Sequence, residues 1–106
     1  MKINGALEVP DEAIAAFCRK WRITELALFG SVLREDFGPE SDVDVLVTFQ
    51  EPVTWGLFDL GHMEDELAAT IGREVDLIDR RAVESSKNWL RRRAILGTAQ
   101  TVYATG

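Results

Sequence analysis

The feature that most constrains this 106-residue chain is the stretch from residue 27 to residue 47, in which a polar loop separates two apolar runs. The first run ends in Gly30 and Ser31, and the second begins with Asp42 and Asp44. Because side chains alternate across a strand, both aspartates would point to one face. Two like charges this close together are costly unless a cation lies between them. Gly30 and Ser31 could offer backbone N–H groups and a hydroxyl to a phosphate. The stretch therefore predicts a metal site that faces a phosphate site.

A third acidic residue, Asp76, lies in a later run that predicts a strand over residues 74–79. Its neighbours Val75 and Leu77 are apolar, and an unpaired carboxylate in such a strand would be expensive. If this strand lies beside the strand that starts at Asp42, all three carboxylates converge. Mg²⁺ is a hard cation that prefers oxygen ligands and bridges carboxylates to substrate phosphates. A pair of such ions can activate an attacking oxygen and stabilise a leaving oxygen.

The rest of the chain reads as helices and strands in alternation. We expect a helix that begins near Pro10, a strand over residues 25–29, a helical turn over 31–34, a strand over 42–49 and a helix over 54–71. The strand over residues 74–79, a helix over 80–96 and an edge strand within 98–104 follow. This order predicts one α/β (α+β) domain over residues 1–106, in which helices are layered on a small sheet.

Two residues of reactive type have ordinary structural interpretations. Cys18 falls on the apolar stripe of the first helix, so it is expected to pack in the core. His62 lies on the helix over residues 54–71 beside acidic residues, with no cysteine or second histidine in helical register. We therefore interpret His62 as a surface or packing residue rather than as a ligand.

Charge and composition narrow the class of protein. The formal net charge of −6 argues against a general nucleic-acid binder, so no direct nucleic-acid binding is expected. Residues 1–71 hold 14 acidic and 5 basic side chains, whereas residues 72–106 hold 4 acidic and 7 basic ones. Such a polarised surface suits a charged partner or a nucleotide, although charges that serve only solubility would look the same.

A single cysteine permits no internal disulfide, and no apolar run approaches the roughly 20 residues of a membrane helix. We expect a cytoplasmic protein with no membrane partner.

The spacing of Gly30-Ser31, Asp42-Val43-Asp44 and Asp76 resembles the signature of the DNA polymerase β-like nucleotidyltransferases. The chain is most similar to the minimal nucleotidyltransferases (MNT) of that superfamily. Within this branch, residues 27–47, 56–60 and 74–78 are close to the form found in MNT antitoxins of HEPN/MNT toxin–antitoxin pairs. The likeness covers roughly residues 20 to 80.

The resemblance implies a polymerase β-like nucleotidyltransferase fold, a small mixed sheet flanked by helices, with ATP as substrate and Mg²⁺, as two ions, as cofactor. It places Gly30 and Ser31 on the triphosphate, and it makes Asp42, Asp44 and Asp76 the metal ligands and catalytic residues. It also implies that the protein is an antitoxin adenylyltransferase, which transfers AMP from ATP to a tyrosine of its cognate HEPN ribonuclease toxin and so neutralises it. Asp76 would then help to deprotonate the tyrosine, and Arg34 could reach the departing pyrophosphate.

The chain departs from this group near its end. Members often carry Asn-Pro-Tyr before the basic segment, where this chain has residues 86–93, with Trp89 followed by Leu90 and three arginines. Trp89 could replace an aromatic core contact. The arginines either face a partner or form a solvated helix face.

Other functions remain compatible with the residues. The chain could be an antitoxin that blocks its toxin by binding alone, without catalysis. It could also be a nucleotidyltransferase for a small-molecule acceptor such as an aminoglycoside, although relatives of that kind use a second helical domain, for which this chain has no room. Solvated aspartates at a strand entry would explain Asp42 and Asp44 singly, but not their spacing from Gly30-Ser31.

Overall fold

The central element is a four-stranded sheet with the strand order β5-β4-β3-β6. The structure is a computed structural model that describes residues 2–3, 7–8, 10–30 and 42–105. The strands are β3 (Ile23–Phe29), β4 (Val43–Phe49), β5 (Val75–Asp79) and β6 (Gln100–Ala104). β3 pairs antiparallel with both β4 and β6, whereas β4 and β5 are parallel. The sheet is therefore mixed, and the predicted α/β class and the edge position of the last strand are confirmed.

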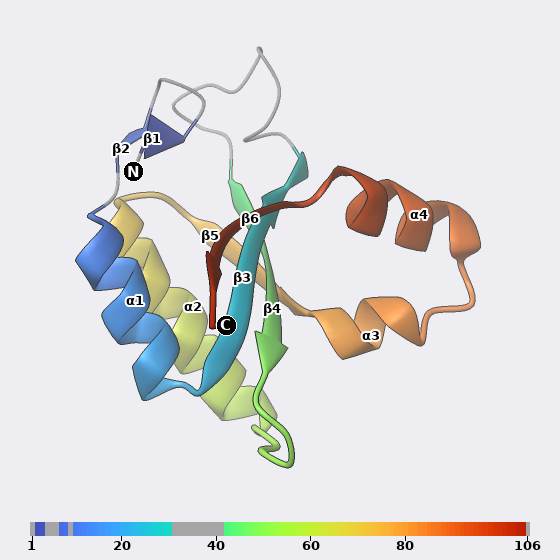
Figure 1. Cartoon of the computed structure of the whole chain (residues 1–106), viewed down its shortest axis with the longest axis horizontal. Coiled ribbons are helices and arrows are strands. Elements are labelled where there is room, and N and C mark those ends of the chain that lie inside the picture. Colours follow the sequence, from blue (N-terminus) through green and yellow to red (C-terminus); the bar gives the residue numbers. More distant parts are fainter. Residues whose placement is uncertain (1, 4–6, 9, 31–41, 106) are drawn as a thin grey trace.

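Helices cover the two faces of this sheet (Figure 1). On one face lie α1 (Asp11–Lys20) and α2 (Leu57–Ile71), and on the other lie α3 (Arg80–Glu84) and α4 (Trp89–Thr98). A two-stranded sheet of β1 (Lys2–Ile3) and β2 (Leu7–Glu8) precedes α1 and was not predicted from the sequence.

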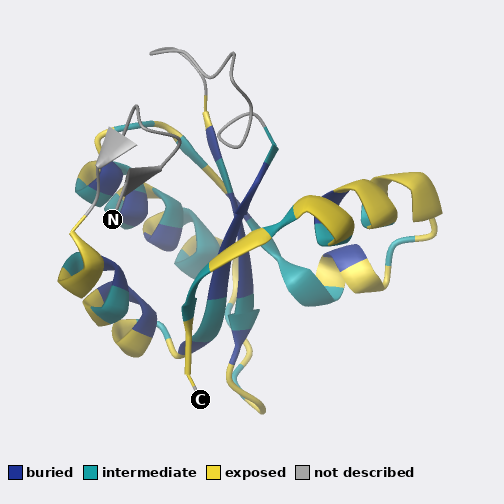
Figure 2. Cartoon of the chain, turned by 45° about the horizontal axis from the view of Figure 1, so that its top comes forward, coloured by how far each residue is buried: buried dark blue, intermediate teal, exposed yellow. Residues whose placement is uncertain are grey.

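The faces carry separate apolar clusters because side chains alternate along β4. Val43, Val45 and Val47 are fully buried against the α1–α2 side, where Met63 and Leu67 of α2 also pack. The opposite cluster is smaller and contains Ala27, Phe29, Leu46, Val83 and Ile95. Figure 2 shows the consequence: the central strands are buried, whereas α4 is largely exposed.

The long helix predicted over residues 80–96 is wrong, since the chain forms two helices separated by residues 85–88. Each helix has its own cap. The side chain of Asp79 accepts a hydrogen bond from the backbone N–H of Arg81 at the start of α3. The Oδ1 atom of Asn88 accepts one from the N–H of Arg91 at the start of α4. Asparagine and aspartate are favoured N-caps, so each supports a new start.

The helix expected from residue 54 begins instead at Leu57. The backbone N–H of Gly56 donates to the carboxylate of Asp59, which fixes the entry to α2. Its end was predicted correctly, since Gly72 follows Ile71 with a left-handed φ of 81°.

The interpretation of three single residues can be checked directly. Cys18 is fully buried, and burial raises the pKa of its thiol to about 12, so the predicted core role is confirmed. His62 is exposed, as expected for a surface residue. Trp89 is 55% exposed, so it does not replace a core contact. Among the described helices, none combines the length and apolar character needed to cross a membrane.

Candidate active site

The candidate site lies at one end of the sheet, where β3 ends and β4 and β5 begin. Phe29, the last residue of β3, is the register partner of Asp44 in β4. Asp44 is in turn the register partner of Asp76 in β5. Gly30 directly follows Phe29, and Asp42 directly precedes β4. The fold therefore brings four of the five predicted site residues to the same end of three neighbouring strands.

The two strand aspartates also share a face of the sheet. Asp44 alternates with Val43 and Val45, which point into the α1–α2 cluster, so Asp44 lies on the opposite face. Asp76 alternates with Val75 and Leu77, which pack in that same cluster. Both aspartates therefore lie on the face that α3 and α4 cover farther along the strands.

Gly30 provides a cradle beside the Asp44 carboxylate. Its φ is 75°, a left-handed conformation that glycine adopts without steric cost. A β-carbon at this position would collide with Oδ2 of Asp44, so the close approach requires a residue without a side chain. Ser31, the other predicted phosphate-binding residue, lies outside the described residues, as do Arg34 and the predicted helical turn over residues 31–34.

The environment of Asp76 differs from the expectation. Although its strand neighbours are apolar, Asp76 itself is exposed, as is Asp42, while Asp44 is half-buried. Water can therefore solvate Asp76, and its charge needs no buried partner. The expected cost of an enclosed carboxylate was wrong, because β5 is an edge strand and Asp76 is near its start.

The donor set suits a hard cation, since it consists of carboxylate oxygens next to a glycine cradle. Over residues 2–3, 7–8, 10–30 and 42–105, no three acidic, histidine or cysteine residues lie in an arrangement that could hold a metal ion. The assignment of Asp42, Asp44 and Asp76 as metal ligands therefore stays a prediction.

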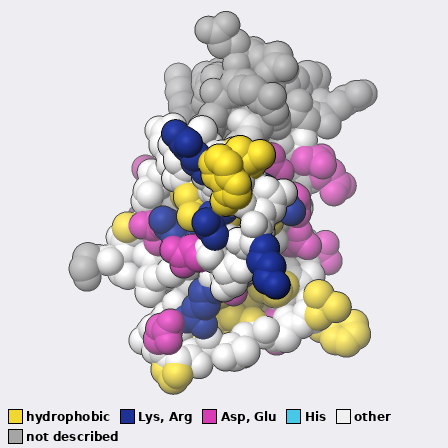
Figure 3. Space-filling model, turned by 90° about the vertical axis from the view of Figure 1, so that its right-hand side faces the viewer, with side chains coloured by type: hydrophobic (Ala, Val, Ile, Leu, Met, Phe, Trp, Pro, Cys, Tyr) yellow, Lys and Arg dark blue, Asp and Glu magenta, His cyan; other side chains and the backbone are white. Residues whose placement is uncertain are grey.

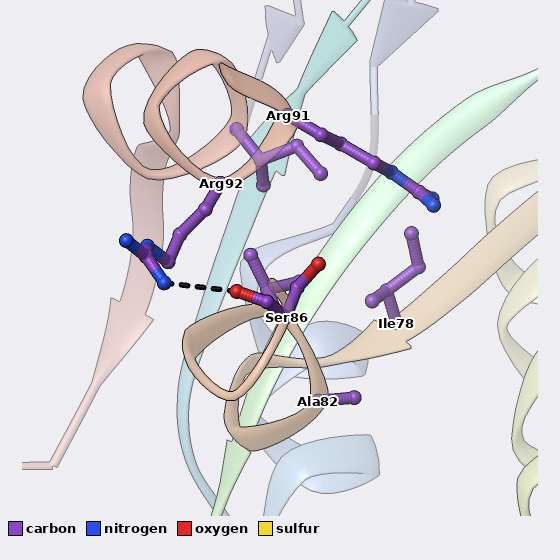
Figure 4. Close-up of a pocket in the computed structure, with 7 residues that line it drawn as sticks. Ile78, Ala82, Ser86, Arg91 and Arg92 are labelled. Carbon is purple, nitrogen blue, oxygen red and sulfur yellow. Dashed lines mark hydrogen bonds between the residues drawn. The ribbon is translucent and has the colours of Figure 1, made fainter. Parts of the chain in front are cut away.

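A groove between α3 and α4 adjoins this site and was not predicted from the sequence. Its volume is about 170 Å³, and its lining residues are Ile78, Ala82, Val83, Ser86, Arg91, Arg92 and Ile95 (Figure 4). Ile78 lies in β5 two residues after Asp76, on the same face. The sequence signal was the run of arginines in residues 91–93, but the groove exists only because the chain turns between α3 and α4.

The sequence matches the family model of the nucleotidyltransferase domain over residues 11–102. The candidate protein adenylyltransferase MJ1217 of Methanocaldococcus jannaschii is 33% identical over 66 residues, which cover 62% of this chain and 65% of that protein. The protein adenylyltransferase MntA of Thermococcus cleftensis is also 33% identical over 66 residues, with the same coverage of both chains. The matched region thus spans slightly less than two thirds of either relative.

Solved structures agree with the sequence comparison. A candidate minimal nucleotidyltransferase is 30% identical with a TM-score of 0.63, and the match covers 84% of this chain and 85% of that one. A toxin–antitoxin complex crystallised with AMP-PNP has a TM-score of 0.70 at 21% identity, covering 92% and 75%. A complex of an MNT antitoxin with the tri-AMPylated HEPN toxin of Shewanella oneidensis has a TM-score of 0.62 at 22% identity, covering 90% and 70%. At these lower identities the last two establish a shared fold.

Proposed function

Because this chain belongs to the nucleotidyltransferase domain family, we propose that it is an antitoxin adenylyltransferase that transfers AMP from ATP to a tyrosine of a HEPN ribonuclease toxin. The transfer neutralises the toxin. The observation that carries the proposal is that Asp44 and Asp76 are register partners on adjacent strands, and that Gly30 directly follows Phe29, the partner of Asp44 on the next strand. Relatives named protein adenylyltransferase and structural neighbours from toxin–antitoxin complexes support a protein as the acceptor.

The proposed reaction is an in-line displacement at the α-phosphorus of ATP. The phenolic oxygen of the acceptor tyrosine forms a bond to that phosphorus, the bond to the β-phosphate oxygen breaks, and pyrophosphate leaves. Such a transfer depends on positioning and charge neutralisation more than on covalent help from the protein. The exposed carboxylate of Asp76 is available to accept the phenolic proton.

Each site residue has a defined part in this proposal. Gly30 lets the triphosphate approach the backbone, and Ser31 adds a hydroxyl. Asp42, Asp44 and Asp76 would hold Mg²⁺, as two ions, which supply charge neutralisation for the phosphates when bound. Held there, the carboxylates would place the cations at the end of the sheet that is open to an acceptor.

The direct test uses a cognate HEPN ribonuclease toxin, the partner that the proposal requires, as acceptor. It is incubated with the purified chain, ATP and Mg²⁺, and its intact mass is measured. We expect the mass to increase by one or more AMP units, with fragmentation locating them on tyrosine, and we expect EDTA to prevent the increase. The Asp44→Asn variant should give no increase, whereas Asp65→Asn, at an exposed position of α2, should act like the wild type. An unchanged acceptor mass with the wild-type chain would refute the proposal.

A second experiment separates catalysis from inhibition by binding. The double variant Asp42→Asn with Asp44→Asn is co-expressed with the toxin, and cell growth is compared with that of the wild-type pair. We expect the variant to leave the toxin active. Full neutralisation by the double variant would instead establish an antitoxin that acts by contact.

A further inference from the structure

We propose that the acceptor protein docks in the groove between α3 and α4 and on the first turn of α4. The partner surface that fits is an apolar side chain flanked by carboxylates. This inference rests on the proposed function in one respect, namely that the acceptor is a protein. Its evidence is the shape, exposure, charge and position of this surface.

The groove has an apolar floor and basic walls. Ile78, Val83 and Ile95 supply the floor from β5, α3 and α4. Arg91 and Arg92 extend on opposite sides of it (Figure 4). The guanidinium of Arg92 donates to the backbone carbonyl of Ser86 at 2.9 Å, which ties α4 to the end of α3. A space of about 170 Å³ is large enough for one apolar side chain, not for a whole helix.

The first turn of α4 exposes two large apolar side chains directly before Arg91 in the sequence. Trp89 is 55% exposed and Leu90 is 63% exposed. Figure 3 views the side of the molecule that carries α4 and shows hydrophobic side chains among lysines and arginines. Tryptophan and arginine are the residue types most enriched in the energetically dominant parts of protein interfaces. This composition therefore favours a protein partner.

The charge of the surface indicates an acidic partner. Within the described part of the chain, Arg91 forms no ion pair, so its guanidinium is available to a ligand. The surrounding residues 72–106 carry an excess of basic side chains, whereas residues 1–71 are strongly acidic. A nucleic acid fits less well, because an aliphatic side chain such as Leu90 and an apolar floor offer nothing to phosphates.

The groove is close enough to the active-site end to present an acceptor. Ile78 is two residues from Asp76 on the same face of β5. At the usual strand rise this is a separation of about 7 Å along the strand. A partner residue that is held in the groove therefore leaves the adjoining part of the partner beside the carboxylates. This gives the chain a way to position a hydroxyl of the partner for attack.

The test uses calorimetry without ATP to measure how tightly the Arg91→Glu variant binds the cognate HEPN protein. We expect the dissociation constant to rise at least about tenfold, since a docking arginine becomes a repelling carboxylate. We expect this variant to fold, because Asn88 is the N-cap of α4 and a carboxylate in the first turn is favoured by the helix dipole. Arg93→Glu is the matched control: it makes the same charge change two residues farther along α4, at a side chain that does not line the groove, and should change the constant less than about threefold.

A second pair of variants tests the apolar part. Trp89→Ala should weaken binding about tenfold, whereas Phe58→Ala, which removes an 87% exposed aromatic ring at the start of α2, should not. In the transfer reaction, Arg91→Glu and Trp89→Ala should raise KM for the protein acceptor and leave kcat within about twofold, because the groove positions the acceptor.

Several results would overturn this inference. The first is that both Arg91→Glu and Trp89→Ala bind the acceptor protein as tightly as the wild type. The second is that the wild-type chain does not bind the acceptor. The third is that the two variants lose affinity for an RNA oligonucleotide but not for the acceptor. A self-association of this chain that Trp89→Ala abolishes while acceptor binding persists would also overturn it. The same experiments distinguish a failure of the docking surface from a failure of the proposed function. If the acceptor binds through the groove but gains no AMP, the transfer is refuted and the docking surface is supported. If AMP is transferred and KM for the acceptor is unchanged in both variants, the transfer is supported and the docking surface is refuted.

Discussion

Gly30 and Asp44 approach so closely that no β-carbon fits between the backbone of the first and the carboxylate of the second. The two residues belong to neighbouring strand ends, since the residue before Gly30 is the register partner of Asp44. A glycine here lets the backbone approach a carboxylate and, in the proposed function, a phosphate. The relationship makes Gly30 a sensitive position for both stability and nucleotide binding.

We predict that Gly30→Ala lowers the free energy of unfolding by about 1–3 kcal/mol, because the new methyl group meets Asp44 and the left-handed φ is strained for alanine. Urea denaturation measures the change. Gly61→Ala is the matched control, since nothing lies within 4 Å of its β-carbon and alanine favours helix by up to about 1 kcal/mol. Equal stability of the two variants would contradict the close approach of Gly30 and Asp44.

Nucleotide binding should be visible as stabilisation. A ligand that binds only the folded chain raises the free energy of unfolding by about 2.7 kcal/mol at one hundred times its dissociation constant. We expect Mg²⁺ with ATP to raise the melting temperature of the wild-type chain and to leave Asp44→Asn and Asp76→Asn unchanged. Asp65→Asn should respond like the wild type. A full shift in Asp76→Asn would remove this residue from the proposed site.

Glu64 should hold the edge strand that carries Asp76. Its Oε2 atom accepts a hydrogen bond of 2.9 Å from the backbone N–H of Leu77 in β5. Glu64→Ala leaves that N–H without its acceptor, so we expect a loss of about 1.5–3 kcal/mol, the usual range for a bond to a charged group. Glu64→Gln retains a carbonyl acceptor and should lose less.

Urea denaturation gives the energy of this contact, and hydrogen exchange at the amide of Leu77 gives its location. Exchange should be faster in Glu64→Ala than in Asp65→Ala, which changes the next residue of α2 at an exposed position. Unchanged exchange at Leu77 would show that the Glu64 carboxylate does not hold this part of β5.

Glu66 should make stability depend on pH in the acid range. Burial acts to raise the pKa of this carboxyl, but hydrogen bonds from Lys20 and Trp21 outweigh it and hold the pKa below the ordinary 4.5. The bonds measure 3.0 Å from Nζ of Lys20 and 2.9 Å from Nε1 of Trp21. A lowered folded-state pKa adds stability above pH 4.5, and that stability is lost as the pH falls below this value.

The direction of the Glu66 pKa shift is tested by measuring the free energy of unfolding of the wild type and of Glu66→Gln over the pH range. We expect the difference in unfolding free energy to be constant near neutrality and to shrink below about pH 4.5. A difference that grows as the medium becomes more acidic would mean that the pKa of Glu66 is raised instead.

Much of this protein could be predicted from local pattern. The strand around Leu28 is apolar, and the strand around Val45 is also rich in β-branched residues; both kinds of run favour strand. The apolar stripe that contains Cys18 likewise identified the first helix and the residues it buries. The split between α3 and α4 was missed, although Asn88 carries the signal. An asparagine can also lie within a helix, and only the structure shows that the side chain of Asn88 caps α4.

The sequence by itself determined the residue types of the site and their places at strand ends, because side-chain alternation and the positions of Gly30, Asp44 and Asp76 are properties of the local chain. Only the tertiary structure decided that β5 lies parallel beside β4 in the register that pairs Asp44 with Asp76. It also decided that Asp76 is exposed and that a groove forms between α3 and α4. These features depend on contacts between residues distant in sequence, which no local pattern encodes.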